Sequence, residues 1–215
     1  MANDPLLLRA KGLKDELVMV RRDLHRHPEL AFKEERTAEK GREYLAALGC
    51  EVQTKIAGTT GLVATVDSGK PGPTLMIRAD MDALPITEDT GLEFASRNAG
   101  VMHACGHDAH VAILMGVAEL LAGMRAEIAG TVKFLFQPNE EGSYDGRPSG
   151  AQKMIEDGVF DDPTPTAVFG LHVTSAQASG LIALRPGGLM ASADSLKINI
   201  HGRQTHGSSP WRGVD

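Results

Sequence analysis

The segment at residues 102–110, M-H-A-C-G-H-D-A-H, holds three histidines, one cysteine and one aspartate in nine residues. Imidazole nitrogen and thiolate sulfur are the donors that a borderline-soft divalent ion prefers, and a carboxylate adds a harder donor. A glycine between Cys105 and His107 would let the backbone bend so that both side chains reach one ion. His103 and His110 compete with them as ligands, and spacing does not choose among the four. The segment predicts a metal site.

A second acidic segment, F-Q-P-N-E-E-G at residues 136–142, places Glu140 and Glu141 directly after a strand-like run. Adjacent carboxylates project differently, so one can bind a metal while the other faces water. Metal-bound water has a pKa lowered towards neutrality, and a nearby carboxylate can take its proton. The alternative is an ordinary surface loop, in which paired glutamates are common. Together the two segments suggest a metallohydrolase.

Two aspartates and several histidines offer further polar groups. Asp80 and Asp82 are two apart and share a face in an extended segment, so they form either a solvated strand end or an anchor for a ligand histidine. His172 follows a strand-like run, where a histidine is usually a satisfied polar residue. His206 lies in a stretch bearing glycine and serine, as a loop residue or a donor to an oxyanion. His25 ends a helix, where imidazole suits the negative dipole end, so we interpret it as structural.

Hydrophobic periodicity defines the elements that must position these groups. Apolar spacing and stop signals predict helices at residues 13–24, 34–48, 109–124 and 150–157. Apolar runs predict strands at residues 62–66, 74–77, 131–136, 167–171 and 196–200, the first two as neighbours. Alternating strands and helices indicate an α/β fold, a sheet flanked by helices. Because open α/β sheets bind ligands beyond the carboxyl ends of their strands, we expect the candidate residues to converge there.

Composition excludes several classes of protein. The 215 residues are 42% hydrophobic and 23% charged, as in an ordinary globular chain. A net charge of −6 gives no sign of a surface for nucleic acid or anionic membrane. Neither a signal segment nor a run long enough to span a membrane is present, and two cysteines make no disulfide framework. We therefore expect a cytoplasmic protein with a small-molecule partner.

Seven segments, in order along nearly the whole chain, closely resemble one family. This family comprises metal-dependent amidohydrolases and peptidases, including hippurate hydrolase, N-acyl-amino-acid amidohydrolases and auxin-conjugate hydrolases. The matching segments are R-R-D-L-H-R-H-P-E-L (21–30), R-A-D-M-D-A-L-P-I (78–86), M-H-A-C-G-H-D-A-H (102–110), F-Q-P-N-E-E-G (136–142), G-A-Q-K-M-I-E-D-G (150–158), F-G-L-H (169–172) and G-R-Q-T-H-G-S-S-P (202–210).

The resemblance implies a two-metal site, and a donor set of cysteine, histidine and carboxylate fits Zn, Mn, Co or Ni. The implied metal ligands are Cys105, His107, Glu141 and His172. It further implies that Glu140 is the general base and acid, and that Asp82 orients the site without binding metal. His206 is similar to a family histidine that reaches into a neighbouring subunit to stabilise the tetrahedral intermediate. Asp80 stands where related carboxypeptidases have a metal-binding histidine.

Three departures from the family pattern matter. Asn139 replaces the common alanine beside the base, and G-R-Q-T-H around His206 replaces G-x-G-G-H. The family also supplies a further metal-binding histidine from its C-terminal part, which would lie beyond Asp215. We therefore expect a C-terminally truncated chain, with residues 1–190 in the catalytic domain and 191–215 beginning a smaller α+β lid and dimerisation domain.

The resemblance implies hydrolysis of the amide bond of an N-acyl amino acid by a metal-activated water. A dipeptidase or carboxypeptidase of the same family, with the same metals and another pocket, is the nearest alternative. A third hypothesis, from a different class of function, is that the chain by itself is a non-catalytic metal-binding or assembly fragment. The intact enzyme is expected to be a homodimer or higher homo-oligomer through the lid. The acyl group and the native metal stay open.

Overall fold

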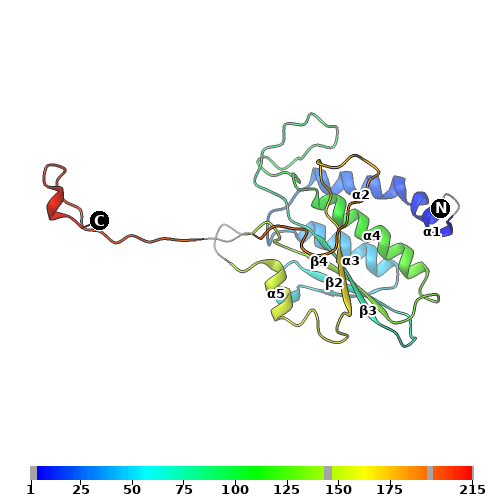
Figure 1. The fold of residues 1–215 in the computed structure, drawn as a ribbon. Helices are drawn as coiled ribbons and strands as arrows, with labels where there is room; N and C mark the ends of the chain where they lie inside the picture. The colour runs from blue at the N-terminus through cyan, green and yellow to red at the C-terminus, as the bar shows by residue number, and fades with distance from the viewer. Residues whose placement is uncertain (1–3, 143–146, 193–195, 215) are drawn as a thin grey trace. The chain divides into compact units, whose positions relative to one another are not determined.

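The computed structural model describes residues 4–142, 147–192 and 196–214. Backbone contacts divide the chain into two units, Met1–Ser175 and Ala176–Asp215. The first unit contains the sheet and the helices that pack on it (Figure 1). In the part of the chain that is described, no helix is long and apolar enough to cross a membrane.

A five-stranded mixed sheet forms the centre of the first unit, in the order β1-β2-β4-β3-β5. β2 pairs antiparallel with β1 and β4, whereas β3 runs parallel to β4 and β5. The carboxyl ends of β3, β4 and β5 therefore point to the same side of the sheet, which we call its carboxyl edge. The strands are β1 (Glu51–Thr54), β2 (Leu62–Asp67), β3 (Thr74–Asp80), β4 (Thr131–Gln137) and β5 (Ala167–Gly170).

The prediction that residues 62–66 and 74–77 form neighbouring strands is wrong, because β4 lies between them. β4 is buried over nearly its whole length, so it gains most from a central place with a strand on either side. The connection from β2 to β3 crosses the start of β4 at Gly130. There φ is +90°, and an added Cβ would lie 2.0 Å from the carbonyl oxygen of Pro73. Only glycine fits this crossing.

Helices cover the two faces of the sheet unequally. One face packs against α2, α3 and α4 around side chains such as Leu24, Leu45 and Phe134. The other face carries a smaller cluster that includes Met154 of α5 and Val63 of β2. The helices are α1 (Pro5–Gly12), α2 (Lys14–Arg26), α3 (Glu35–Ala47), α4 (His107–Gly123) and α5 (Gly150–Glu156), with short 3-10 turns η1 (Ile56–Gly58) and η2 (Pro210–Arg212).

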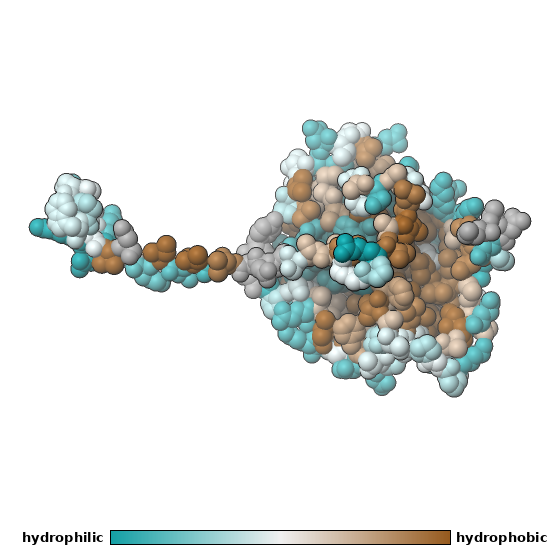
Figure 2. Space-filling model, in the orientation of Figure 1, coloured by the Kyte–Doolittle hydropathy of each residue, from teal (hydrophilic) through white to brown (hydrophobic). Residues whose placement is uncertain are grey.

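β5 is the edge strand of the described sheet and is exposed along its length. Val168 and Phe169, which alternate between its faces, are 52% and 59% exposed. Apolar side chains gather on the face of this unit that Figure 2 shows. A strand that is apolar on both faces is typical of the interior of a sheet.

The second unit differs from the prediction in one element. Residues 196–200 form no strand, and Leu196, Ile198 and Ile200 are 86%, 70% and 81% exposed. An alternating segment becomes a strand only when a neighbouring strand takes its backbone hydrogen bonds. Among the described residues of this unit, the only β pairing is the bridge between Arg203 and Val214. The division by contacts falls at Ser175, and a domain boundary at residue 190 stays a prediction.

Candidate metal centre

Segments far apart in the sequence meet at the carboxyl edge of the sheet, as expected. β3 ends at Asp80, β4 leads into Glu140 and Glu141, and β5 leads into His172. α4 begins at His107 beside them. Among the described residues, three groups of side chains have potential ligand atoms within 4.8 Å of one another, and every group contains His107: Cys105 with His107 and His172, His107 with Glu140 and Glu141, and Asp80 with His107 and His110.

His107 stands at the centre of the cluster and is completely buried. Its Nδ1 lies 3.3 Å from Asp82 Oδ1, and its Nε2 lies 3.7 Å from carboxylate oxygens of Asp80, Glu140 and Glu141. Neither ring nitrogen has a hydrogen-bond partner among the described residues. A buried imidazole without hydrogen-bond partners lowers the stability of the fold unless another group contacts its nitrogens. A cation between Nε2 and the carboxylates would do so.

The electrostatic field around His107 also suits a cation. Burial disfavours a charged imidazole, but the carboxylates of Asp82, Asp80 and Glu140 outweigh burial and raise the pKa of His107. Burial also raises the pKa of the Cys105 thiol to about 12, with the charges of Glu141, Glu140 and Asp80 adding to it. A thiolate forms in such surroundings when a metal ion compensates the negative charge. The donors present therefore fit divalent metal.

Cys105 and His172 approach each other from the start of α4 and the end of β5. Cys105 Sγ lies 3.4 Å from His172 Nε2. His172 Nδ1 donates to the carbonyl oxygen of Val173 at 2.6 Å, so in the neutral ring Nε2 is the nitrogen without a proton and can act as a ligand. Gly106, at φ +86°, permits the approach, since an added Cβ would lie 2.3 Å from Val173 Cγ2. The glycine in this segment therefore has a second function, close packing.

Asp82 holds the two glutamates in place. Its Oδ1 and Oδ2 accept the backbone N–H groups of Glu140 and Glu141, each at 3.1 Å, and the aspartate is 1% exposed. One buried carboxylate thus contacts both glutamate amides and faces His107 Nδ1. Asp82 therefore positions Glu140 and Glu141, and its role in orienting metal ligands stays a prediction.

His110 supports the cluster through both of its ring nitrogens. Nε2 accepts the backbone N–H of Val173 at 2.9 Å, so Nδ1 carries the proton and donates to Asp80 Oδ1 at 2.6 Å. Burial alone would raise the pKa of Asp80, but the bond from His110 and the charges of His107 and Arg78 lower it to about 2. With both nitrogens engaged, His110 positions Asp80 and the segment after β5.

His103 and His25 belong to a neighbouring buried cluster. His25 Nδ1 donates to Asp108 Oδ2 at 2.8 Å, and Nε2 lies 3.3 Å from a carboxylate oxygen of Glu88. Burial lowers the pKa of His103 to about 4, and its ring nitrogens have no hydrogen-bond partner among the described residues. His25 ties α2 to the first turn of α4, which agrees with its interpretation as a structural residue.

Sequence reasoning missed Glu34, which is completely buried next to the cluster. Its Oε1 accepts the backbone N–H groups of Phe32 and Asn139, each at 3.0 Å. Asn139 has φ +46°, in the left-handed region that asparagine adopts more readily than most residues, and directly precedes Glu140. Glu34 thus stabilises the turn that presents the glutamates. An acidic residue before a helix is normally a surface residue, so the sequence carries no signal of its burial.

His206 lies in the second unit and is described within that unit alone. It is exposed, and its Nδ1 lies 2.8 Å from the hydroxyl oxygen of Ser208. Its role at the active site of a neighbouring subunit stays a prediction.

Fold and site define an α/β protein whose sheet carries soft and hard metal donors at one edge. Residues 76–212 match the model of peptidase family M20/M25/M40, and the chain belongs to this family. The resemblance seen in the sequence is thereby confirmed.

Relatives share much of the sequence of this chain. It is 45% identical over 205 residues to thermostable carboxypeptidase 1 of Saccharolobus solfataricus, covering 95% of this chain and 51% of the relative. It is 43% identical over 205 residues to an N-acetylcysteine deacetylase of Bacillus subtilis, covering 95% and 52%. The chain therefore spans about half the length of the curated relatives it matches.

A solved structure also matches the fold of this chain. The crystal structure of the Bacillus subtilis YXEP protein, described as a dinuclear metal binding peptidase of the M20 family, matches with a TM-score of 0.69. It is 45% identical, and the match covers 76% of this chain and 44% of that chain. The α/β catalytic fold expected from the sequence is confirmed.

Proposed function

We propose that this chain carries the site of a metal-dependent hydrolase that cleaves the amide bond of N-acyl amino acids. The observation that carries the proposal is the convergence on buried His107 of a thiol, a second imidazole and two glutamates. Proton-transfer and metal-ligand groups in one cluster are what amide hydrolysis requires. The N-acetylcysteine deacetylase among the relatives supports this substrate class.

The proposed ligands of two divalent ions are Cys105, His107, Glu141 and His172. Their donor set mixes thiolate, imidazole and carboxylate, which suits Zn, Mn, Co or Ni. Ions bound there would polarise the substrate carbonyl and lower the pKa of water. The YXEP protein, described as dinuclear, supports the count of two.

Glu140 is the proposed general base and acid. Its side chain is 37% exposed and that of Glu141 is 23% exposed, so Glu140 is the more accessible to water, although both carboxylates lie 3.7 Å from His107 Nε2. Its backbone N–H is held by Asp82 at 3.1 Å. In this account Glu140 removes a proton from the attacking water and delivers it to the leaving nitrogen, and Asp82 acts by positioning it.

Further parts of the proposal concern the second unit and the assembly. We place residues 191–215 at the start of a lid and dimerisation domain. His206 would donate to the oxyanion in the active site of a neighbouring subunit of a homo-oligomer. A cytoplasmic location agrees with the reduced thiol that Cys105 must keep.

A carboxypeptidase or dipeptidase is the second candidate, favoured by the 45% identity to a relative named thermostable carboxypeptidase. It would use the same cluster, because both reactions hydrolyse an amide. The two candidates differ in the substrate pocket alone.

The test compares metal-replete protein on hippurate, N-acetyl amino acids and unblocked dipeptides, and repeats the assay with Glu140→Gln. We expect release of free amino acid from the acylated substrates, and its loss in Glu140→Gln with metal content unchanged. Glu51→Gln, an exposed change on β1, is the matched control and should keep full activity. Cleavage of dipeptides alone would establish the peptidase. Near-full activity of Glu140→Gln would refute its role as the base. Metal binding by the wild type without any turnover would refute the proposed hydrolysis and identify the chain as a non-catalytic metal-binding fragment.

A further inference from the structure

The turn that carries Glu140 and Glu141 is held by two buried carboxylates. The backbone N–H groups of residues 139, 140 and 141 donate to carboxylate oxygens, the first to Glu34 and the other two to Asp82. Asp82 lies beside the metal-ligand groups, whereas Glu34 reaches the turn from the position that precedes α3. Two carboxylates from different parts of the chain therefore fix one short stretch of backbone.

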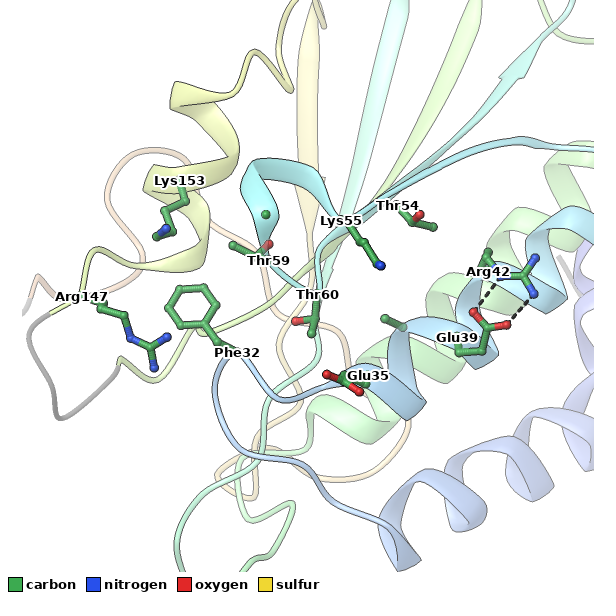
Figure 3. Close-up of a pocket in the computed structure, with 12 residues that line it drawn as sticks. Phe32, Glu35, Glu39, Arg42, Thr54, Lys55, Thr59, Thr60, Arg147 and Lys153 are labelled. Atoms are coloured by element: carbon green, nitrogen blue, oxygen red, sulfur yellow. Dashed lines mark hydrogen bonds and ion pairs between the residues drawn. The ribbon is translucent and has the colours of Figure 1, made fainter.

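Glu34 also joins this turn to two further segments. Its Oε1 accepts the backbone N–H of Phe32 at 3.0 Å, and its Oε2 accepts the hydroxyl of Thr60. Phe32 and Thr60 line the cavity drawn in Figure 3, which shares no residue with the metal-ligand groups. One completely buried side chain thus connects the wall of this cavity to the residue that precedes Glu140.

Asn139, at the start of the turn, is completely buried and is held from the side of α5 as well. Its carbonyl oxygen accepts the backbone N–H of Gly150 at 3.1 Å, and its side-chain amide donates to the carbonyl oxygen of Pro148 at 3.3 Å. Gly150 lies so close to the turn that an added Cβ would overlap the carbonyl oxygen of Pro138. The start of the turn is therefore clamped between α5 and Glu34.

The two buried carboxylates use their oxygen atoms differently. Asp82 accepts one backbone N–H on each oxygen, so it needs both oxygens. Glu34 accepts both of its backbone N–H groups on Oε1 and leaves Oε2 to the Thr60 hydroxyl. Glu34→Gln would keep an oxygen at Oε1 and donate its amide to Thr60, because a hydroxyl accepts as well as donates. Burial raises the pKa of Glu34, so an uncharged side chain also suits this position.

We propose that Glu34 is a positioning residue of the metal centre, which places Glu140 and Glu141 by accepting the backbone N–H of Asn139. What this role requires is the length of the side chain and one acceptor oxygen, and negative charge is not required. The effect on metal binding rests on the proposed function, whereas the hold on the Asn139 amide does not.

The test compares Glu34→Asp with Glu34→Gln in competition for Zn²⁺ with a chromophoric chelator. Glu34→Asp keeps the charge but is one methylene too short to hold Asn139, so Zn²⁺ binding should weaken at least about tenfold, as it does when other residues that orient metal ligands are lost. Glu34→Gln keeps the length and the acceptor oxygen and should bind within about threefold of the wild type. Wild-type affinity in Glu34→Asp, or binding by Glu34→Gln that is at least as weak as that of Glu34→Asp, would overturn the proposal.

Thr60→Val is the matched control, because it changes a contact of the same carboxylate. It removes the hydroxyl from Oε2 and leaves the bond from Asn139 on Oε1, so it should lower the midpoint of urea unfolding without changing Zn²⁺ affinity. A loss of affinity in Thr60→Val equal to that in Glu34→Asp would show that metal binding follows overall stability. That result would overturn the positioning role.

Hydrogen exchange of the Asn139 backbone amide in the metal-free protein separates this role from the proposed function. We expect slow exchange in the wild type and in Glu34→Gln, and exchange at least about tenfold faster in Glu34→Asp. Rapid exchange of this amide in the wild type would overturn the proposal whether or not the variants fold. A wild type that binds no Zn²⁺ would refute the proposed metal centre, and the exchange rates would then decide the hold of Glu34 by themselves.

Discussion

Replacing Asp82 by asparagine should weaken metal binding without unfolding the protein. The aspartate is 1% exposed and accepts the N–H groups of Glu140 and Glu141, one on each oxygen. Asparagine keeps the shape but has one oxygen, so one backbone N–H would meet an amide NH2. The substitution also removes the negative charge that faces His107 Nδ1 at 3.3 Å.

The magnitude follows from these contacts. One charge-assisted hydrogen bond is worth about 1.5–3 kcal/mol. Loss of a residue that orients metal ligands typically costs about 10–100-fold in metal affinity, which is about 1.4–2.7 kcal/mol. The two figures agree, so we expect Asp82→Asn to weaken Zn²⁺ binding by about one to two orders of magnitude.

The assay is competition for Zn²⁺ with a chromophoric chelator, together with urea unfolding of the metal-free protein. Asp67→Asn, at the exposed end of β2, removes the same charge away from the site and should bind as the wild type does. If Asp82→Asn keeps its affinity within about twofold while its fold is intact, the positioning role derived from its hydrogen bonds is refuted.

Two further predictions concern the first turn of α4. Gly106→Ala should lower the free energy of unfolding by about 2–4 kcal/mol in urea, because its Cβ would lie 2.3 Å from Val173 Cγ2 on a backbone at φ +86°. Gly91→Ala, at φ +66° with open space around it, should cost only about 1 kcal/mol; equal losses would disprove the close packing. The pKa of His25 is raised above its ordinary 6.5, chiefly by the hydrogen bond to Asp108, so its contribution is complete below pH 6.5 and is lost as pH rises through the folded-state pKa. The stability difference between wild type and His25→Gln should therefore shrink from pH 6 to pH 9 in urea titrations, and a growing difference would contradict the interaction.

Much of the fold is local and could be predicted from the sequence. Apolar periodicity located the helix after residue 107 and the strand that leads into Glu140, since burial of one face determines such elements. The order of the strands could not be predicted. It depends on the crossing at Gly130, where two backbones approach too closely for any side chain. Residues 196–200 were predicted to form a strand and do not form one. Alternating apolar residues form a strand only where a neighbouring strand takes their backbone hydrogen bonds.

The candidate site shows the same limits. Residues at strand ends could be predicted to converge because parallel strands share one edge. The support from Glu34 could not, because its burial comes from segments at residues 60 and 139 folding around it. Spacing alone could not distinguish His107 from His110, and the resemblance to the family did. The hydrogen bonds at both nitrogens of His110 agree with a supporting role.

The most direct test of the metal centre is anomalous diffraction from crystals grown with Zn²⁺. We predict a peak about 2.3 Å from Cys105 Sγ and about 2.1 Å from a nitrogen of His107 or His172. We predict a second peak beside Glu141. Zinc bound elsewhere, or no ordered zinc near His107 in crystals that contain it, would contradict the proposed metal centre.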